Sequence, residues 1–171
     1  LPTLRETVEK YGLMAKKSLG QNFLLDYNIT QKIIRSSLAS QQRADFSGCH
    51  VYEIGPGPGG LTRAILSANP EQMTVIEMDK RCIQIMKDLQ NFGYRQLYIV
   101  EGDALKFNFI QTYDALSKHI VSNLPYNISV PLLVRWLKNI THFESMTLMF
   151  QKEGAERIAA QPNNKNYGRI S

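Results

Sequence analysis

Four consecutive residues that follow an apolar stretch, Asn123, Leu124, Pro125 and Tyr126, suit chemistry on an aromatic amine. The exocyclic amine of a nucleobase is a poor nucleophile because its lone pair is delocalised into the ring. The amide oxygen of Asn123 and the backbone carbonyl of Leu124 would accept its two N–H bonds and aim the lone pair at a methyl donor. Pro125 fixes the backbone, and Tyr126 offers a face on which an extruded base stacks. These four residues are therefore candidate catalytic residues.

Three further apolar stretches are each followed by residues that suit a nucleoside ligand. The glycine-rich loop 53–62 allows close approach of the backbone through Gly55 and Gly57. Glu77 lies 22 residues beyond Gly55, where an acid accepts hydrogen bonds from ribose hydroxyls. Asp103 is placed to accept from an adenine amino group. Helix caps or a tight turn explain each feature taken alone, and the set does not separate a nicotinamide dinucleotide from S-adenosylmethionine.

Alternating strands and helices are expected to position these residues. The hydrophobic pattern predicts strands at 49–54, 73–77, 97–102, 119–123 and 146–150, and helices at 4–11, 27–40, 61–68, 80–90, 130–140 and 152–160. Thr3 and Glu6 match a capping box, and Asp79 is expected to cap the helix after the second strand. A mostly polar stretch follows the third strand. The alternation is typical of an α/β fold, a mostly parallel sheet with helices on both faces.

The length and charge of the chain fit one domain that contacts an anionic partner. The chain has 171 residues and a net charge of +5, with the basic excess in residues 1–43 and 152–171. These flanks suit RNA, although solvated lysines explain the charge equally well. No apolar run is long enough to span a bilayer, and the N-terminus lacks an apolar signal core. With its two cysteines expected to be reduced, we expect a cytoplasmic protein.

Other catalytic chemistries have little support in the sequence. His50, His119 and His142 are scattered beside strands and are expected at the surface or at strand edges. There is no zinc-spaced Cys/His set, no G-x-S-x-G segment and no Walker loop, so no metal is expected. Cys49 and Cys82 are expected to be reduced thiols in the core.

Six segments together resemble the ribosomal RNA adenine dimethyltransferases of the kasugamycin-resistance type. They are KKSLGQNFL (16–24), EIGPGPGGLT (53–62), VIEMD (75–79), GDAL (102–105), NLPYNIS (123–129) and FQKEGAERI through YGRIS (150–171). The resemblance implies a Rossmann-like, S-adenosylmethionine-dependent methyltransferase fold. It also implies methyl transfer from S-adenosylmethionine to N6 of two adjacent adenines near the 3′ end of small-subunit (16S) ribosomal RNA. The product would be N6,N6-dimethyladenine, made during ribosome biogenesis.

The resemblance also implies roles for individual residues. The residues expected to bind the cofactor are Gln21, Asn22, Leu24, Gly55, Gly57, Glu77, Met78, Asp103, Ala104 and Asn123. Gly55 would lie against the methionine part, Glu77 would hold the ribose, and Asp103 would hold the adenine amino group. Asn123 would lie between the cofactor and the target base. Residues 1–26 would form a lid in which Phe23 and Leu24 exclude water. The residues expected to hold RNA phosphates are Lys16, Lys17, Arg157, Lys165 and Arg169.

The chain departs from the family pattern in two places. Family members continue past Ser171 with two more strands and a helical RNA-binding domain. We therefore expect residues 1–171 to be a monomeric methyltransferase domain, truncated before the last strands and weakly active or inactive alone. Gly154 replaces a bulky aliphatic residue, which predicts an unfilled core position. The alternatives are a large-subunit (23S) RNA methyltransferase of the erythromycin-resistance type, or a non-catalytic RNA-binding assembly or transcription factor. A mitochondrial homologue makes the mitochondrial matrix the alternative location.

Overall fold

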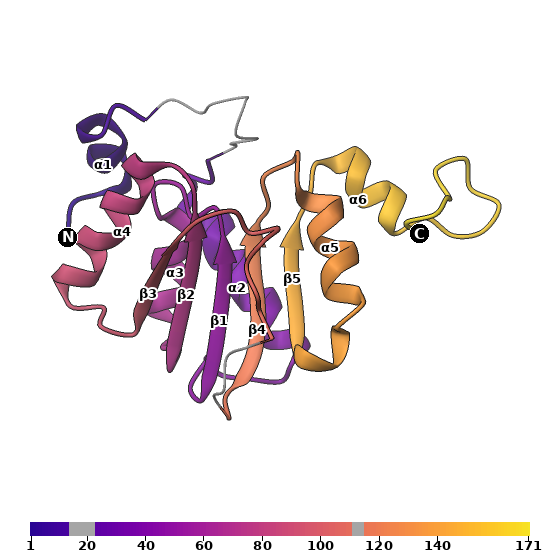
Figure 1. Cartoon of the computed structure of the whole chain (residues 1–171), viewed down its shortest axis with the longest axis horizontal. Helices are drawn as coiled ribbons and strands as arrows, with labels where there is room; N and C mark the ends of the chain where they lie inside the picture. Colours follow the sequence, from indigo (N-terminus) through magenta and orange to yellow (C-terminus); the bar gives the residue numbers. More distant parts are fainter. Residues whose placement is uncertain (14–22, 111–114) are drawn as a thin grey trace.

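A parallel five-stranded sheet with helices on both faces forms the body of the molecule (Figure 1). The computed structural model describes residues 1–13, 23–110 and 115–171. The strand order is β3-β2-β1-β4-β5, and every neighbouring pair is parallel. The strands are β1 (Cys49–Ile54), β2 (Gln72–Glu77), β3 (Leu97–Glu101), β4 (Ser117–Asn123) and β5 (Ser145–Met149). The predicted fold class is confirmed.

The described helices also match the predicted ones, with boundaries that differ by at most three residues. They are α1 (Leu4–Lys10), α2 (Tyr27–Ser40), α3 (Gly60–Ser67), α4 (Lys80–Phe92), α5 (Ser129–Leu137), α6 (Lys152–Ile158) and the 3-10 turn η2 (Ile140–His142). The largest difference is in α5, which ends at Leu137 because the chain turns there into η2. No described helix is long and apolar enough to cross a membrane.

The predicted helix caps are present. Thr3 and Glu6 form a capping box in which the Glu6 amide donates to Thr3 Oγ1 at 3.2 Å. The carboxylate of Asp79 caps α4 by accepting from the amide of Arg81 at 3.0 Å. These bonds satisfy amides that have no partner within the first turn of a helix.

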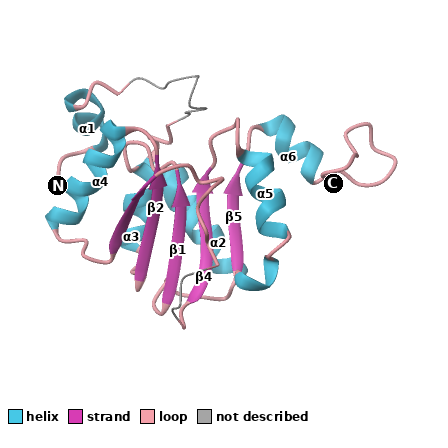
Figure 2. Ribbon diagram, in the orientation of Figure 1, coloured by secondary structure: helices cyan, strands magenta, loops and turns pink. Residues whose placement is uncertain are grey.

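Two hydrophobic cores lie on opposite faces of the sheet, because successive strand residues point to opposite sides. On one face, Val51 and Val75 pack with residues of α2, α3 and α4, and α2 and α3 lie behind the strands in Figure 2. On the other face, Tyr52 packs with Trp136 of α5 and with Phe109. Phe109 comes from the stretch after β3, which was predicted to be mostly polar, and it is 3% exposed. That stretch therefore covers part of the sheet in place of a helix.

Two of the three histidines contradict the prediction of surface or strand-edge positions. His50 and His119 are buried, while His142 is exposed. His50 Nε2 lies 2.8 Å from the hydroxyl of Thr74, and His119 Nδ1 lies 2.8 Å from the hydroxyl of Ser145. Hydroxyl groups on neighbouring strands thus satisfy imidazole nitrogens inside the sheet, and this pairing cannot be read from single positions.

The prediction of an unfilled core position at Gly154 is also wrong. Helix α6 has no buried residue, and among the described residues a Cβ on Gly154 would meet only the Cβ of Phe150, at 3.8 Å. The prediction for the two cysteines is confirmed, since Cys49 and Cys82 are both buried and neither belongs to a disulfide.

Candidate functional site

A cavity of about 240 Å³ opens at the carboxyl ends of the central strands. This is the edge at which parallel α/β sheets bind ligands. Nine of the predicted site residues line it: Leu24, Gly55, Gly57, Glu77, Met78, Asp103, Ala104, Asn123 and Pro125. Phe23, expected in the lid, lines it as well. Gln21 and Asn22 lie outside the described residues, as do Lys16 and Lys17. The fold therefore gathers residues from four strand ends and from the segment before α2.

The glycine loop after β1 is closely packed on two sides. Gly55 has φ +65°, and a Cβ there would lie 3.2 Å from Cγ of Pro125. Gly57 has φ +55°, and a Cβ there would lie 2.9 Å from Cδ1 of Phe23. Only glycine combines these backbone angles with such close neighbours. The loop thus links the Pro125 side of the cavity to the Phe23 side.

Glu77 ends β2 with its carboxylate held by backbone amides. Its Oε1 accepts from the amides of Met78 at 2.7 Å and Asp79 at 2.8 Å, and its Oε2 accepts a longer bond from Gly57 at 3.4 Å. Burial raises the pKa of Glu77, while these amide bonds lower it. The amides fix the orientation of the carboxylate, and its position in the cavity wall lets it accept bonds from hydroxyl groups.

Asp103 sits in the turn after β3. Its Oδ1 accepts from the amide of Leu105 at 2.9 Å, which fixes the side chain relative to the turn. Within the described part of the chain, Oδ2 has no hydrogen-bond partner. The turn therefore leaves one acceptor for an amino group of a ligand in the cavity.

Glu53 also lines the cavity, and the sequence reasoning missed it. The residue is 2% exposed, and its Oε2 accepts from the hydroxyl of Thr62 at 2.7 Å. Burial raises its pKa to about 8, against the opposing effect of the Thr62 bond and with a smaller contribution from the charge of Glu77. An acid as the penultimate residue of β1, two positions before Gly55, was the available signal.

The segment after β4 forms a tight turn. The amide of Ile128 donates to the carbonyl of Pro125 at 3.2 Å, and the hydroxyl of Ser129 donates to the carbonyl of Tyr126 at 3.1 Å. Asn123 and Pro125 line the cavity, whereas the side chain of Leu124 is packed in the core. Only the backbone of Leu124 is thus suited to the predicted role. Tyr126 does not line the cavity, and 43% of its surface is exposed.

The charge of the cavity favours a cationic ligand. Among the described residues that line it, every ionisable side chain is acidic: Glu53, Glu77 and Asp103. A pyrophosphate group would meet Glu77 and Asp103 and, among the described lining residues, no basic side chain. A sulfonium or ammonium group would be attracted instead.

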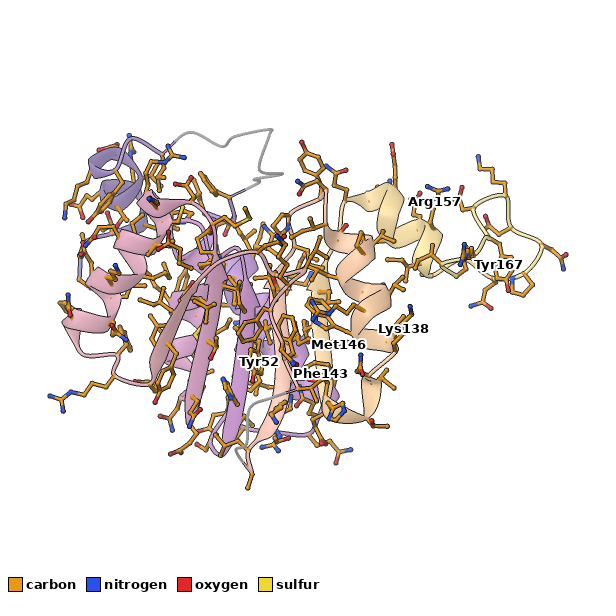
Figure 3. All side chains as sticks on the ribbon, viewed as in Figure 1. Tyr52, Lys138, Phe143, Met146, Arg157 and Tyr167 are labelled. Carbon is orange, nitrogen blue, oxygen red and sulfur yellow. The ribbon has the colours of Figure 1, made fainter. Side chains whose placement is uncertain are left out.

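The predicted RNA-binding residues that the structure describes lie away from the cavity lining. Arg157 is exposed on α6, and Lys165 and Arg169 are exposed in the segment that follows. Figure 3 shows Arg157 and Tyr167 where α6 and the C-terminal segment extend beyond the sheet. The described residues contain no group of three or more potential metal ligands.

Comparison with known proteins gives one consistent family. The model of the family described as ribosomal RNA adenine dimethylase matches residues 12–171. Ribosomal RNA small subunit methyltransferase A of Mesorhizobium japonicum is 47% identical, over 99% of this chain and 62% of its own length. The protein of the same name from Rhodospirillum rubrum is 44% identical, over 100% of this chain and 57% of its own. The chain thus spans about 60% of the length of these curated relatives.

Two solved structures of methyltransferases are also similar to the chain. A dimethyladenosine transferase from Plasmodium falciparum is similar with a TM-score of 0.72 and 33% identity, covering 87% of this chain and 50% of that one. The 23S rRNA methyltransferase ErmE is similar with a TM-score of 0.65 and 25% identity, covering 88% of this chain and 54% of that one.

Proposed function

The chain belongs to the ribosomal RNA adenine dimethylase family, and we propose that it carries the methyl-transfer site of an RNA adenine N6,N6-dimethyltransferase. The substrate would be two adjacent adenines near the 3′ end of small-subunit ribosomal RNA. The observation that supports this most strongly is that Asn123 and Pro125 line the same cavity as Glu77 and Asp103. Residues suited to a target amine thus share one space with residues suited to a nucleoside cofactor.

The cavity fits S-adenosylmethionine. Its acidic lining suits the sulfonium and ammonium charges, and the glycine loop leaves room that a Cβ at Gly55 or Gly57 would fill. In this proposal Glu77 accepts from the ribose hydroxyls, and Oδ2 of Asp103 accepts from the adenine amino group. Met78 and Ala104 flank the adenine, and Phe23 and Leu24 exclude water on the other side. Gln21 and Asn22 are retained as proposed cofactor contacts on the strength of the resemblance.

Bound S-adenosylmethionine would supply an electrophilic methyl group with a neutral thioether as the leaving group. Asn123 accepts from the target amine and holds its lone pair toward the cavity. The Leu124 carbonyl accepts the second N–H, and the turn closed by Ile128 and Ser129 keeps both acceptors in place. Tyr126 stacks on the extruded base from outside the cavity. This catalysis is positioning and electrostatics, and solvent takes the amine proton after transfer.

RNA phosphates are the proposed partners of the basic residues at both ends of the chain. Arg157, Lys165 and Arg169 are exposed, and Lys16 and Lys17 belong to the same proposal. Contacts of this kind orient RNA on the protein without reading its sequence.

A methylation assay tests the proposal. The chain would be mixed with labelled S-adenosylmethionine and either small or large ribosomal subunits that lack the modification, at a stoichiometric amount of protein because transfer is expected to be slow. The RNA would then be digested and analysed by mass spectrometry. We expect N6,N6-dimethyladenosine from small subunits, lost in Asn123→Ala and retained in the control Asn91→Ala, which changes an exposed asparagine on α4.

Two other results would each replace the proposal. Product from large subunits alone would support the erythromycin-resistance type, which the similarity to ErmE makes the second candidate. Absence of product from both subunits, with a cellular effect that survives Asn123→Ala, would support a non-catalytic RNA-binding factor.

A further inference from the structure

Arg135 connects helix α5 to the turn that follows β3. Its Nη1 donates to the carbonyl of Leu105 and, at 3.4 Å, to the carbonyl of Ala104. Both of these residues line the cavity, whereas Arg135 itself does not. The guanidinium therefore binds, from outside the cavity, the backbone of a segment that lines the cavity.

The turn that Arg135 binds also contains Asp103. The Asp103 carbonyl accepts from the amide of Lys106 at 2.9 Å, and its Oδ1 accepts from the amide of Leu105. These bonds orient the carboxylate relative to the turn, but they do not fix the turn relative to the rest of the cavity. The amide of Gly102 joins the start of the turn to the carbonyl of Glu77 at 2.9 Å. The bonds from Arg135 join the far side of the turn to α5, which begins where the Asn123–Ile128 turn ends.

No carboxylate competes for the guanidinium. Within the described part of the chain, the side chain of Arg135 has no ion pair, and its bonds go only to the two carbonyls. A hydrogen bond from a charged donor to a neutral carbonyl is stronger than one from an uncharged donor. Arg5, by contrast, pairs with an acid on its own helix, Glu9.

We infer that Arg135 is a positioning residue that fixes the Asp103 turn and thereby sets the preference of the cavity for adenine over a base without the 6-amino group. The inference rests on the proposed binding of S-adenosylmethionine. Its consequence is that one side chain on α5 aligns the half of the cavity that holds the adenine with the half that presents the target amine.

The test is calorimetric titration with S-adenosylhomocysteine and with S-inosylhomocysteine, in which oxygen replaces the adenine amino group. We expect wild-type protein to prefer the adenine ligand. Arg135→Gln should bind it about tenfold more weakly, as expected when a charge-assisted bond is lost, while the inosine ligand changes little. Arg135→Lys, which keeps a charged donor, should restore part of the preference. The control is Lys138→Gln at the exposed end of the same helix (Figure 3), which removes an equal charge.

The outcomes separate the inference from the proposed function. If wild type binds neither ligand, the proposed cofactor site is wrong and the inference falls with it. If wild type prefers adenine and Arg135→Gln keeps that preference, or weakens both ligands equally, Arg135 is only structural and the inference is overturned. Thermal melting of each variant shows whether it is folded at the temperature of the titration.

Discussion

The hydroxyl of Ser122 donates to the carbonyl of Ile54 at 2.9 Å and accepts from the amide of Ile54 at 3.2 Å. This pair of bonds joins the ends of β1 and β4 beyond their last paired residues, Tyr52 and Ile120. It holds Asn123 beside the glycine loop, because Asn123 directly follows Ser122 and Gly55 directly follows Ile54. One buried hydroxyl thus sets the spacing between the two sides of the cavity.

Ser122→Ala should therefore weaken both the fold and the site. The substitution leaves a buried amide and a buried carbonyl without their partner, which costs about 1–3 kcal/mol. Urea denaturation would measure that loss, and titration with S-adenosylhomocysteine would show a lower affinity. Ser36→Ala, at an exposed position of α2, is the control and should change neither value. Unchanged stability in Ser122→Ala would contradict this role.

Gly57→Ala should abolish cofactor binding. The residue has φ +55°, and the new methyl group would lie 2.9 Å from the ring of Phe23. Either Phe23 moves out of the cavity wall or the loop changes its backbone angles, and both change the shape of the site. Fluorescence or calorimetric titration would show the loss. Gly168→Ala is the matched control, because its Cβ would meet no described residue within 4 Å and it lacks a positive φ.

Tyr126→Ala should slow methyl transfer and spare cofactor affinity, because the ring lies outside the cavity lining. Loss of a stacked base costs about 1–3 kcal/mol, or roughly five- to 150-fold in transfer rate. Single-turnover methylation would measure the rate, and calorimetry the affinity. Tyr126→Phe should keep most of the activity because it retains the ring. A parallel loss of affinity and rate in Tyr126→Ala would show that the residue supports the cofactor site instead.

Glu53 should make the protein less stable as the pH rises. Its pKa is about 8 in the fold and 4.5 as its ordinary value, mainly because it is buried. Below pH 4.5 the carboxyl is protonated in both the folded and the unfolded state, and its contribution to the free energy of unfolding is complete. Between pH 4.5 and 8 the unfolded chain releases the proton more readily than the fold does, so stability falls. Urea denaturation at pH 5.5, 7 and 8.5 would show this slope. Glu53→Gln should flatten it, and an equal slope in that variant would assign the effect to another group.

His119 should make the protein less stable as the pH falls. Burial, with help from the charge of Arg43, lowers its pKa from 6.5 to about 4. Above pH 6.5 the ring is neutral in both states; as the pH falls from 6.5 to 4 the unfolded chain takes up a proton that the fold excludes, so stability is lost. NMR titration of the imidazole would measure the pKa directly. A measured His119 pKa at the ordinary value of 6.5 would refute the prediction.

The order and type of the elements followed from the sequence because hydrophobic periodicity and caps are local. Thr3 and Asp79 show this, since each cap depends on residues within three positions. Glu77, Asp103 and Asn123 each stand at or just after the end of a predicted parallel strand, and the carboxyl ends of parallel strands meet at one edge of the sheet. What the sequence could not show depends on long-range pairing. Ser122 reaches Ile54 across 68 positions, and His119 reaches Ser145 across 26.

Binding of S-adenosylmethionine by the cavity is the central claim, and equilibrium titration of the chain with S-adenosylmethionine and, separately, with a nicotinamide dinucleotide tests it most directly. We predict saturable one-to-one binding of S-adenosylmethionine, weakened at least tenfold in Glu77→Ala because the ribose loses its carboxylate partner. The dinucleotide should not bind, since its pyrophosphate would meet the carboxyl groups of Glu77 and Asp103. Binding of the dinucleotide without binding of S-adenosylmethionine would contradict the account.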